Sequence, residues 1–234
     1  MATIVTIDSK PTTIPIDPAK TAVIVVDMQN DFGSKGGMFD RAGIDIAGIQ
    51  GAIAPTAKVL TAARRAGMTI VYLKKGYKPD LSDLGAPDAP NRVRHLEFLS
   101  VGKTVETPSG KPGRILIRDT WGTDIVEALE PHASDLVMYK HRFSGFYETD
   151  LDATLKRGGI KHLIVTGCTT SVCVESTVRD ASFRDYQCVL LSDCMSEPIG
   201  NDAPTSNHDA SLLVIQMLFG WVSTSEKFLK ALPG

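Results

Sequence analysis

Two stretches decide the fold of this chain: TAVIVVDMQNDF at residues 21–32 and HLIVTGCTTSVCVEST at residues 162–177. Each opens with a run of mostly β-branched residues that is apolar at consecutive positions, as strands buried on both faces of a sheet are. A carboxylate follows the first run directly, and a thiol follows the second run after a short turn. The sequence therefore predicts a parallel sheet with reactive groups where its strands end.

Similar apolar runs recur along the chain and alternate with segments of helical periodicity. Strands are predicted at residues 21–26, 68–73, 136–139, 162–166 and 187–191, and helices at residues 47–66, 123–129, 149–157, 170–184 and 206–219. Gly67 and the pair Gly158-Gly159 lie where helices should end. The alternation predicts an α/β protein with three layers, α/β/α, around a mainly parallel sheet with right-handed crossovers.

One long segment, residues 74–113, interrupts this alternation. It is rich in Pro, Gly, Asp and Arg and shows no convincing periodicity. A structureless stretch of this length inside a compact domain is usually a functional loop or lid, and its alternative is a disordered insertion. Because no linker or repeat is visible, we expect residues 1–234 to form one domain that carries this lid-like insertion.

Composition excludes several classes of partner. The 234 residues include 25 Lys and Arg against 27 Asp and Glu, for a formal net charge of −2, so non-specific binding to nucleic acid or anionic membranes is not expected. No apolar run approaches the ~20 residues that span a bilayer, and no secretory signal is visible. The spacing of the four cysteines, Cys168, Cys173, Cys188 and Cys194, fits neither zinc sites nor a disulfide framework. These features predict a cytoplasmic protein with free thiols.

Three residues end or follow predicted strands and form a candidate site. Asp27 ends the first strand, Lys140 ends the strand at 136–139, and Cys173 follows the strand at 162–166 by a turn that opens a helix. Ligands of open parallel sheets bind outside the carboxyl ends of the strands, where these groups would converge. Each has an ordinary alternative: a turn cap for Asp27, a solvated basic tip for Lys140, and helix packing for Cys173.

The combination suits hydrolysis of a C–N bond through a covalent thiol intermediate. A thiol with a pKa near ~8.5 is mostly protonated at neutral pH, and a helix N-terminus and a nearby cation lower that pKa. We therefore expect Lys140 to favour the thiolate of Cys173, and Asp27 to take the thiol proton and return it to the departing nitrogen. Backbone N–H groups of residues 167–173 would stabilise the oxyanion formed at an acyl or carbamoyl carbon.

Three longer segments carry a resemblance to a known family: TAVIVVDMQNDF (21–32), VMYKHRFSGFYETDLDATLKRGGIKHLIVTG (137–167) and TTSVCVESTVRDASFRDYQCVLLSDC (169–194). From about residue 21 to its C-terminus, the chain resembles the isochorismatase-like cysteine hydrolases, whose order of Asp, Lys and T-G-x-x-T-x-x-C-V it shares. The resemblance implies a parallel sheet between helices and a triad that cleaves small amides, with Asp27 as general base, Lys140 as the lysine and Cys173 as nucleophile. It also implies a homo-oligomer, a dimer or a tetramer, with lid segments near neighbouring active sites.

The resemblance implies a particular turn before the nucleophile as well. Members of the family carry a non-proline cis peptide there, which falls at Cys168-Thr169 in this chain. That turn would aim the N–H of Thr169 inward to form an oxyanion hole with the N–H of Cys173, and Thr170 would help to fix it.

Departures from the patterns within the family narrow the reaction. Isochorismatases cleave a vinyl ether and lack the cysteine, so Cys173 argues against that activity. Nicotinamidases carry Asp-x-His and a further His that hold a metal beside the second strand, whereas that place reads KKGYKPD (74–80) here. The five histidines show no paired ligand spacing. We therefore expect no metal and no cofactor.

Two branches that act on ureido compounds match better. Residues 27–50 and 76–84 resemble biuret hydrolases, and residues 139–151, 173–180 and 219–223 resemble ureidoacrylate amidohydrolases. A small planar ureide needs several convergent hydrogen-bond partners. The candidate substrate contacts, apolar walls included, are Asn30, Phe32, Lys35, Tyr77, Trp121, Arg142, Phe146 and Gln216. The guanidinium of Arg142 suits a substrate carboxylate or a structural salt bridge. The alternative for the Phe and Trp residues is that they pack in the hydrophobic core and do not contact substrate.

The sequence thus predicts an amidohydrolase that cleaves a C–N bond of a small ureido or carbamoyl compound through an acyl-enzyme on Cys173, with release of ammonia or an amine. The alternatives are another activity of the family, such as an N-carbamoylsarcosine-type amidase or a nicotinamidase, or a binding protein of the same fold without catalysis. The sequence does not select the ureide, because a single pocket side chain can exchange one small planar substrate for another.

Overall fold

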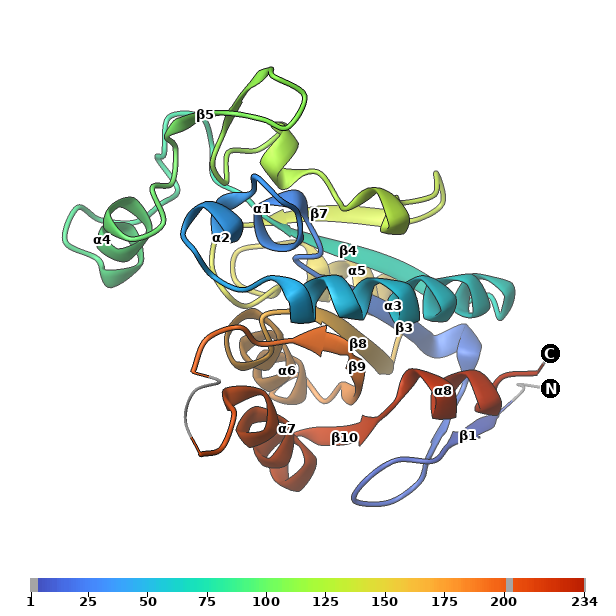
Figure 1. Cartoon of the computed structure of the whole chain (residues 1–234). Coiled ribbons are helices and arrows are strands. Elements are labelled where there is room, and N and C mark those ends of the chain that lie inside the picture. The colour runs from blue at the N-terminus through green and yellow to red at the C-terminus, as the bar shows by residue number, and fades with distance from the viewer. Residues whose placement is uncertain (1–3, 201–203, 234) are drawn as a thin grey trace.

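The computed structural model describes residues 4–200 and 204–233. A six-stranded parallel sheet runs through the molecule in the order β10-β9-β8-β3-β4-β7 (Figure 1). All five strands predicted from the sequence are present, and a sixth, β10, adds an edge that was not predicted. The strands are β3 (Thr21–Val26), β4 (Thr69–Lys75), β7 (Leu136–Lys140), β8 (His162–Cys168), β9 (Gln187–Ser196) and β10 (Gly220–Ser223).

The central strand β3 explains why its sequence is apolar at consecutive positions. Val23 and Val25 belong to the core on one face of the sheet, and Ala22, Ile24 and Val26 belong to the core on the other. Successive side chains of a strand point to opposite faces, so an uninterrupted apolar run fills both cores. All five side chains are fully buried.

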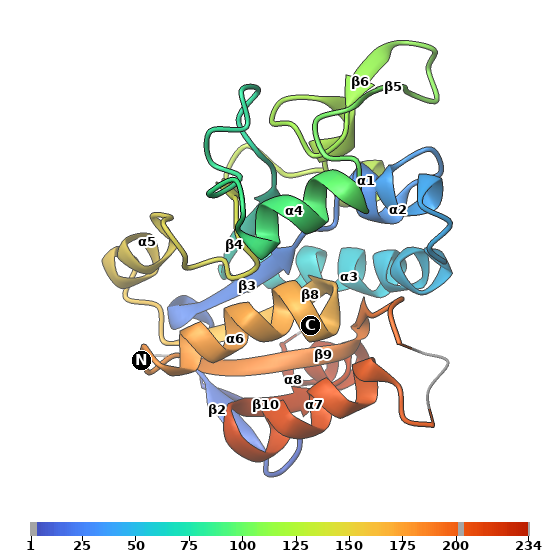
Figure 2. The same ribbon diagram turned by 90° about the vertical axis from the view of Figure 1, so that its left-hand side faces the viewer.

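Helices cover both faces of this sheet and complete the predicted three-layer α/β/α arrangement (Figures 1 and 2). Helices α3 (Ala47–Arg65) and α8 (Ser225–Ala231) pack on one face. The other face carries α5 (Leu151–Arg157), α6 (Glu175–Ser182) and α7 (Asn207–Leu218). Within the described ranges, no helix has the length and apolar character needed to cross a membrane.

The helix predicted at residues 123–129 is wrong. Two short 3-10 turns, η2 (Trp121–Thr123) and η3 (Glu127–Leu129), lie there with extended backbone between them. The extended part pairs with the segment after β3, since the N–H of Asn30 donates to the carbonyl of Asp124 and the N–H of Val126 donates to the carbonyl of Met28. This long-range pairing overrides the local helical periodicity.

Residues 74–113 contain regular secondary structure, although their sequence shows no periodicity. They contain helix α4 (Pro90–Glu97) and an antiparallel hairpin of β5 (Thr104–Glu106) and β6 (Pro112–Arg114). Proline at the first helical position is compatible with a helix start. Figure 1 shows α4 beyond the carboxyl ends of the strands, on the same side as α1 (Asn30–Gly33) and α2 (Met38–Arg41).

A separate hairpin precedes the sheet, formed by β1 (Val5–Ile7) and β2 (Ile14–Ile16) and followed by the 3-10 turn η1 (Pro18–Lys20).

Candidate active site

Asp27, Lys140 and Cys173 meet at the carboxyl edge of the sheet. Asp27 follows β3, Lys140 ends β7, and Cys173 lies in a π-helical turn, η4 (Thr170–Val174), that follows β8 and leads into α6. The Nζ of Lys140 lies 2.7 Å from Oδ2 of Asp27, and the thiol of Cys173 interacts electrostatically with both side chains. All three are buried. The structure thus brings together three groups that lie far apart in the sequence.

A close approach of β3 and β8 fixes the backbone at this edge. Gly167 has a φ of +115°, and a Cβ atom there would lie 2.0 Å from the carbonyl oxygen of Val26. Only glycine fits such an approach. The backbone of Asp27 is also left-handed, with a φ of +52°, a region that Asp tolerates better than most residues. Its carbonyl accepts a hydrogen bond from the thiol of Cys168 at 3.2 Å, which ties the two strand ends together.

The turn that carries Cys173 begins at a cis peptide between Cys168 and Thr169, as the family resemblance implied. The carbonyl of Thr169 accepts from the N–H groups of Val172 and Val174, both at 3.2 Å. The turn therefore folds back on Thr169. Cys173 lies between Val172 and Val174, the two residues whose N–H groups donate to that carbonyl.

Side chains from two other elements hold the same turn. The N–H and the hydroxyl of Ser171 donate to Oε2 of Glu197, at 2.9 and 2.6 Å. The hydroxyl of Thr170 lies 2.9 Å from Nδ1 of His208, which links the turn to α7. Neither Glu197 nor His208 was identified from the sequence, because nothing local to either residue connects it to a turn some thirty positions away.

Burial controls the ionisation of the candidate nucleophile. It raises the pKa of the Cys173 thiol to about 11, although the ammonium of Lys140 acts in the opposite direction. The lowered pKa expected from the sequence is therefore wrong for the free protein, because desolvation outweighs the nearby cation. A protonated thiol needs a base at the moment of attack. Oδ1 of Asp27 is buried and, among the described residues, has no hydrogen-bond partner, so it is available as that acceptor.

A cavity of about 300 Å³ opens over Cys173. Its walls are largely apolar and come from α1, α2, α4, the segment after β7 and the turn after β8. Its polar members are few, and one of them, Lys75, was not among the predicted site residues. The lining residues used below are Phe32, Lys75, Arg94, His95, Phe143 and Thr169.

Lys75 ends β4, the strand that lies between β3 and β7. Its side chain is 1% exposed, and its Nζ has no hydrogen-bond partner within the described part of the chain. Burial lowers the pKa of Lys75 to about 7, and the neighbouring Lys140 acts in the same direction. The sequence does contain a signal for this residue, since Lys75 ends a buried strand as Lys140 does, but it lies within residues 74–113, where the apolar pattern stops.

The comparisons with known proteins agree with this architecture. The sequence matches the isochorismatase domain over residues 21–227. The chain belongs to the isochorismatase family. It is 39% identical to ureidoacrylate amidohydrolase RutB of Methylobacterium radiotolerans, over 97% of this chain and 85% of that protein. It is 38% identical to the RutB protein of Caulobacter segnis, over 96% of this chain and 90% of that protein.

Solved structures of the family share the fold. A cysteine hydrolase from Pseudomonas syringae pv. phaseolicola superposes with a TM-score of 0.76 and 29% identity, and the match covers 93% of this chain and 94% of that one. N-carbamoylsarcosine amidase from Thermoplasma acidophilum superposes with a TM-score of 0.64 and 26% identity, and the match covers 88% and 97% of the two chains. The isochorismatase match begins at Thr21, the first residue of β3, so the hairpin of β1 and β2 lies outside it.

One of the predicted substrate contacts, Phe32, lines the cavity. Tyr77 does not line it, but its ring centre lies 5.3 Å from Nζ of Lys75, which does. Thr169, predicted to stabilise the oxyanion, also lines the cavity beside Cys173.

The structure places the other predicted contacts elsewhere. The amide of Asn30 donates to the carbonyl of Trp121 and accepts from the hydroxyl of Ser34, so Asn30 and Trp121 join α1 to the turn η2, and neither lines the cavity. Lys35 is exposed and pairs with Asp40 at 2.8 Å. These polar groups already have protein partners.

Three further candidates also lie outside the residues that line the cavity. The guanidinium of Arg142 donates to the backbone carbonyls of Asp83 and His141. Arg142 therefore holds the backbone through hydrogen bonds to carbonyl groups, whereas the sequence suggested a substrate carboxylate or a salt bridge. Phe146 packs on Tyr186 in the core beneath α5 and α6. Gln216 lies on α7, at a separate surface hollow beside β10.

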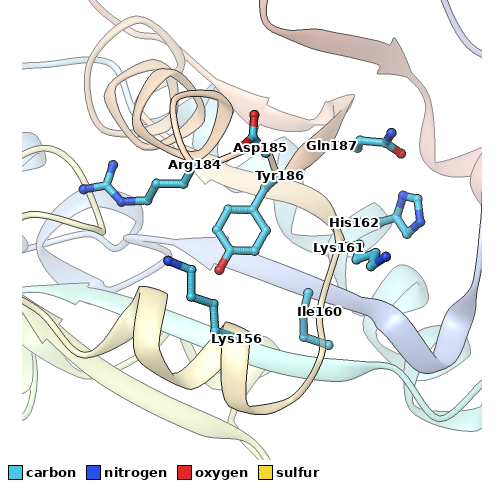
Figure 3. Close-up of a pocket in the computed structure, with 8 residues that line it drawn as sticks. All are labelled: Lys156, Ile160, Lys161, His162, Arg184, Asp185, Tyr186 and Gln187. Atoms are coloured by element: carbon cyan, nitrogen blue, oxygen red, sulfur yellow. The ribbon is translucent and has the colours of Figure 1, made fainter.

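A larger hollow lies at the opposite edge of the sheet. It measures about 550 Å³ and is lined by residues at the start of β8 and β9, among them His162, Tyr186 and Gln187 (Figure 3). These are the amino ends of the strands, where no member of the Asp27, Lys140 and Cys173 cluster lies. Size alone therefore does not identify the site in this fold. Among the described residues, no group of three or more His, Cys, Asp or Glu side chains is arranged to hold a metal ion.

Proposed function

We propose that this protein is an amidohydrolase that cleaves a C–N bond of a small ureido or carbamoyl compound by covalent catalysis with Asp27, Lys140 and Cys173. The observation that carries this proposal is the buried cluster itself, in which Lys140 lies 2.7 Å from Asp27 and the thiol of Cys173 borders a cavity of about 300 Å³. Curated relatives named ureidoacrylate amidohydrolase support a ureide substrate, and biuret-type compounds are the second candidate class.

Acylation uses Asp27 twice. As the sulfur of Cys173 attacks the carbonyl carbon, the thiol proton passes to the Asp27 carboxylate, which lies in its immediate surroundings. The backbone N–H groups of Thr169 and Cys173 stabilise the oxyanion of the tetrahedral intermediate. Asp27 then gives the proton to the leaving nitrogen, the C–N bond breaks, and ammonia or an amine departs.

Deacylation reverses the roles of the same groups. Asp27 accepts a proton from water, the hydroxide attacks the carbon of the acyl-enzyme, and the sulfur leaves. Return of the proton to sulfur frees the acid product and restores the thiol. Burial opposes the charge on Lys140, but its interactions with Asp27 and Cys173 together outweigh burial and raise the pKa of Lys140, so the ammonium persists and holds Asp27 in place.

Replacement of the nucleophile tests the proposal. Cys173→Ala and Cys173→Ser should lower ammonia release by at least about 1,000-fold, because both remove the nucleophilic sulfur, with the circular dichroism spectrum unchanged. Biuret, triuret, ureidoacrylate, N-carbamoylsarcosine and nicotinamide form the substrate panel. Cys188→Ala is the matched control, since Cys188 is another fully buried cysteine but does not line the cavity. Substantial activity of a Cys173 variant toward any ureide would reject the mechanism.

We propose further that the protein acts in the cytoplasm on a small-molecule ureide without a metal or cofactor. Residues 1–234 form a single domain in this proposal, with residues 74–113 as the lid-like insertion over the cavity, and copies of the chain associate into a dimer or a tetramer. Light scattering of the purified protein measures the oligomeric state directly.

A further inference from the structure

The cavity holds one buried cation that the proposed reaction does not use. Lys75 is 1% exposed, yet none of the donors on its Nζ has a partner within the described residues. An ammonium carries three donors, and a buried charge without an acceptor is costly. Because Lys75 lines the same cavity as Cys173, the missing acceptor is a group that a ligand in this cavity can supply.

The position of Lys75 is fixed by its surroundings. The side-chain amide of Gln29 donates to the carbonyl of Lys75 at 2.9 Å and accepts from its N–H at 2.7 Å, in a fully buried pair. The Nζ lies 4.5 Å from the ring centre of Phe143 and 5.3 Å from that of Tyr77. Aromatic faces favour a cation, but a ring is not a full hydrogen-bond acceptor. The ammonium is therefore held in place while its donors remain unpaired.

The rest of the cavity favours an anion as the ligand group. Its lining also includes Arg94, an exposed residue of α4, and the buried His95, and within residues 4–200 and 204–233 no Asp or Glu lines it. Burial lowers the pKa of His95 to about 4, so its ring is neutral at physiological pH. The remaining walls are mostly apolar. Among the described lining residues, the side chains that carry a charge near neutral pH are those of Lys75 and Arg94, and both are cationic, which suits a carboxylate.

We propose that Lys75 binds the carboxylate of a ureido acid, and that the protein selects such acids over uncharged ureides such as biuret. In this arrangement the ureido carbonyl lies at Cys173 and the carboxylate accepts hydrogen bonds from Nζ of Lys75. This inference rests on the proposed function and specifies its substrate class. Lys75 is a specificity-determining residue here, and it takes no proton in the reaction.

The charges around Lys75 make binding of the acid dependent on pH. Lys140 and Arg142 disfavour its protonation, and the carboxylate of Asp27 and a thiolate at Cys173 favour it; Arg94 and His95 of α4 also line the cavity. With a pKa of about 7 in the free protein, Lys75 loses its charge as the pH rises above that value. A bound carboxylate stabilises the ammonium, so binding of the acid near pH 7.5 takes up a proton and weakens toward pH 9.

Calorimetry on a protein that cannot turn over tests this inference. In the Cys173→Ala variant, 3-ureidoacrylate should bind at least tenfold more tightly than its primary amide at pH 7. Addition of Lys75→Met should reduce that ratio to about one and leave the affinity for the amide within twofold. Lys74→Met is the matched control. Lys74 is the neighbouring residue of β4, and its ammonium lies 4.7 Å from the ring of Tyr139 and 3.9 Å from Asp124, so the ratio should stay unchanged.

Several outcomes would overturn the inference. They are equal binding of acid and amide by the Cys173→Ala protein, no binding of either, and a preference for the acid that survives Lys75→Met. Should Lys75→Met fail to fold, Lys75→Gln replaces it, and the Cys173→Ala protein must also lose its preference for the acid between pH 6 and pH 9. Failure of the proposed function is distinguishable, because it shows as absent ammonia release by the unmodified protein, while the binding ratio and its dependence on Lys75 are still measured.

Discussion

The reactivity of Cys173 toward a small alkylating agent follows from its burial. Its pKa of about 11 in the free protein leaves about 3 thiolates in 10,000 at pH 7.5, whereas an unperturbed cysteine with a pKa near ~8.5 has roughly one in ten. Because only the thiolate reacts, we expect iodoacetamide to modify Cys173 on the order of 300-fold more slowly than a free cysteine, before any further slowing by limited access. The rate should rise steadily from pH 7 to pH 11.

The variant Asp27→Asn makes this prediction more specific. The negative charge of Asp27 raises the pKa of the thiol, and the ammonium of Lys140 lowers it. Loss of the charge on Asp27 should therefore lower the pKa of Cys173 and accelerate alkylation, while the loss of the base abolishes turnover. Reactivity toward iodoacetamide and catalytic activity should change in opposite directions in one variant.

Mass spectrometry of the peptide that contains Cys173 follows the reaction and separates it from the three other buried cysteines, Cys168, Cys188 and Cys194. Rates are compared between pH 6 and pH 11 for the unmodified protein and Asp27→Asn, with a model peptide as the reference thiol. An apparent pKa at or below about 8.5 in the unliganded protein, or slower alkylation of Asp27→Asn, would refute the reasoning.

Two changes elsewhere test the fold around the site. Gly167→Ala places a Cβ atom 2.0 Å from the carbonyl oxygen of Val26 and should lower the free energy of unfolding by about 3 kcal/mol or more; urea unfolding measures this, with Gly51→Ala as the control, because a Cβ atom there meets nothing within 4 Å. For Lys75, the pKa of about 7 in the folded state lies below the unfolded value of ~10.4, so the unfolded state binds more protons between these values and stability rises with pH. Lys75→Met should therefore stabilise the protein most below pH 7 and progressively less toward pH 10, and equal shifts in melting temperature at pH 6 and pH 9.5 would contradict the lowered pKa.

The sheet and the reactive cluster were predictable because both follow from one-dimensional patterns. A run such as Val23 to Val26 can be apolar at every position only if both faces of the strand are buried, and Asp27 and Lys140 stand where such runs end. The same rule applied to β4 would have identified Lys75. The last two residues of β4, Lys74 and Lys75, fall inside the segment that lacks periodicity, which hides the end of this strand in the sequence.

The cavity walls and the energetics were not predictable in this way. Similarity of a segment to a ureide-binding relative does not say which of its side chains face the cavity, and Lys35 and Phe146 face elsewhere. The pKa of Cys173 depends on how completely the fold excludes water from the thiol. The residues next to Cys173 in the sequence do not predict this degree of burial. The helix expected at residues 123–129 was displaced by pairing with residues 28–30, a contact between distant segments.

Part of the cavity wall belongs to a segment of the chain that carries none of the reacting groups. All groups proposed to make and break bonds lie at strand ends or on the turn after β8, whereas α4, inside a surface insertion, supplies Arg94 and His95, and Phe98 and Leu99 directly after it supply part of the apolar wall. Mutations in α4 can therefore alter which molecule is admitted without rebuilding the chemistry beneath it. A library confined to residues 90–99 is consequently a promising starting point for redirecting this scaffold toward other nitrogen-rich compounds.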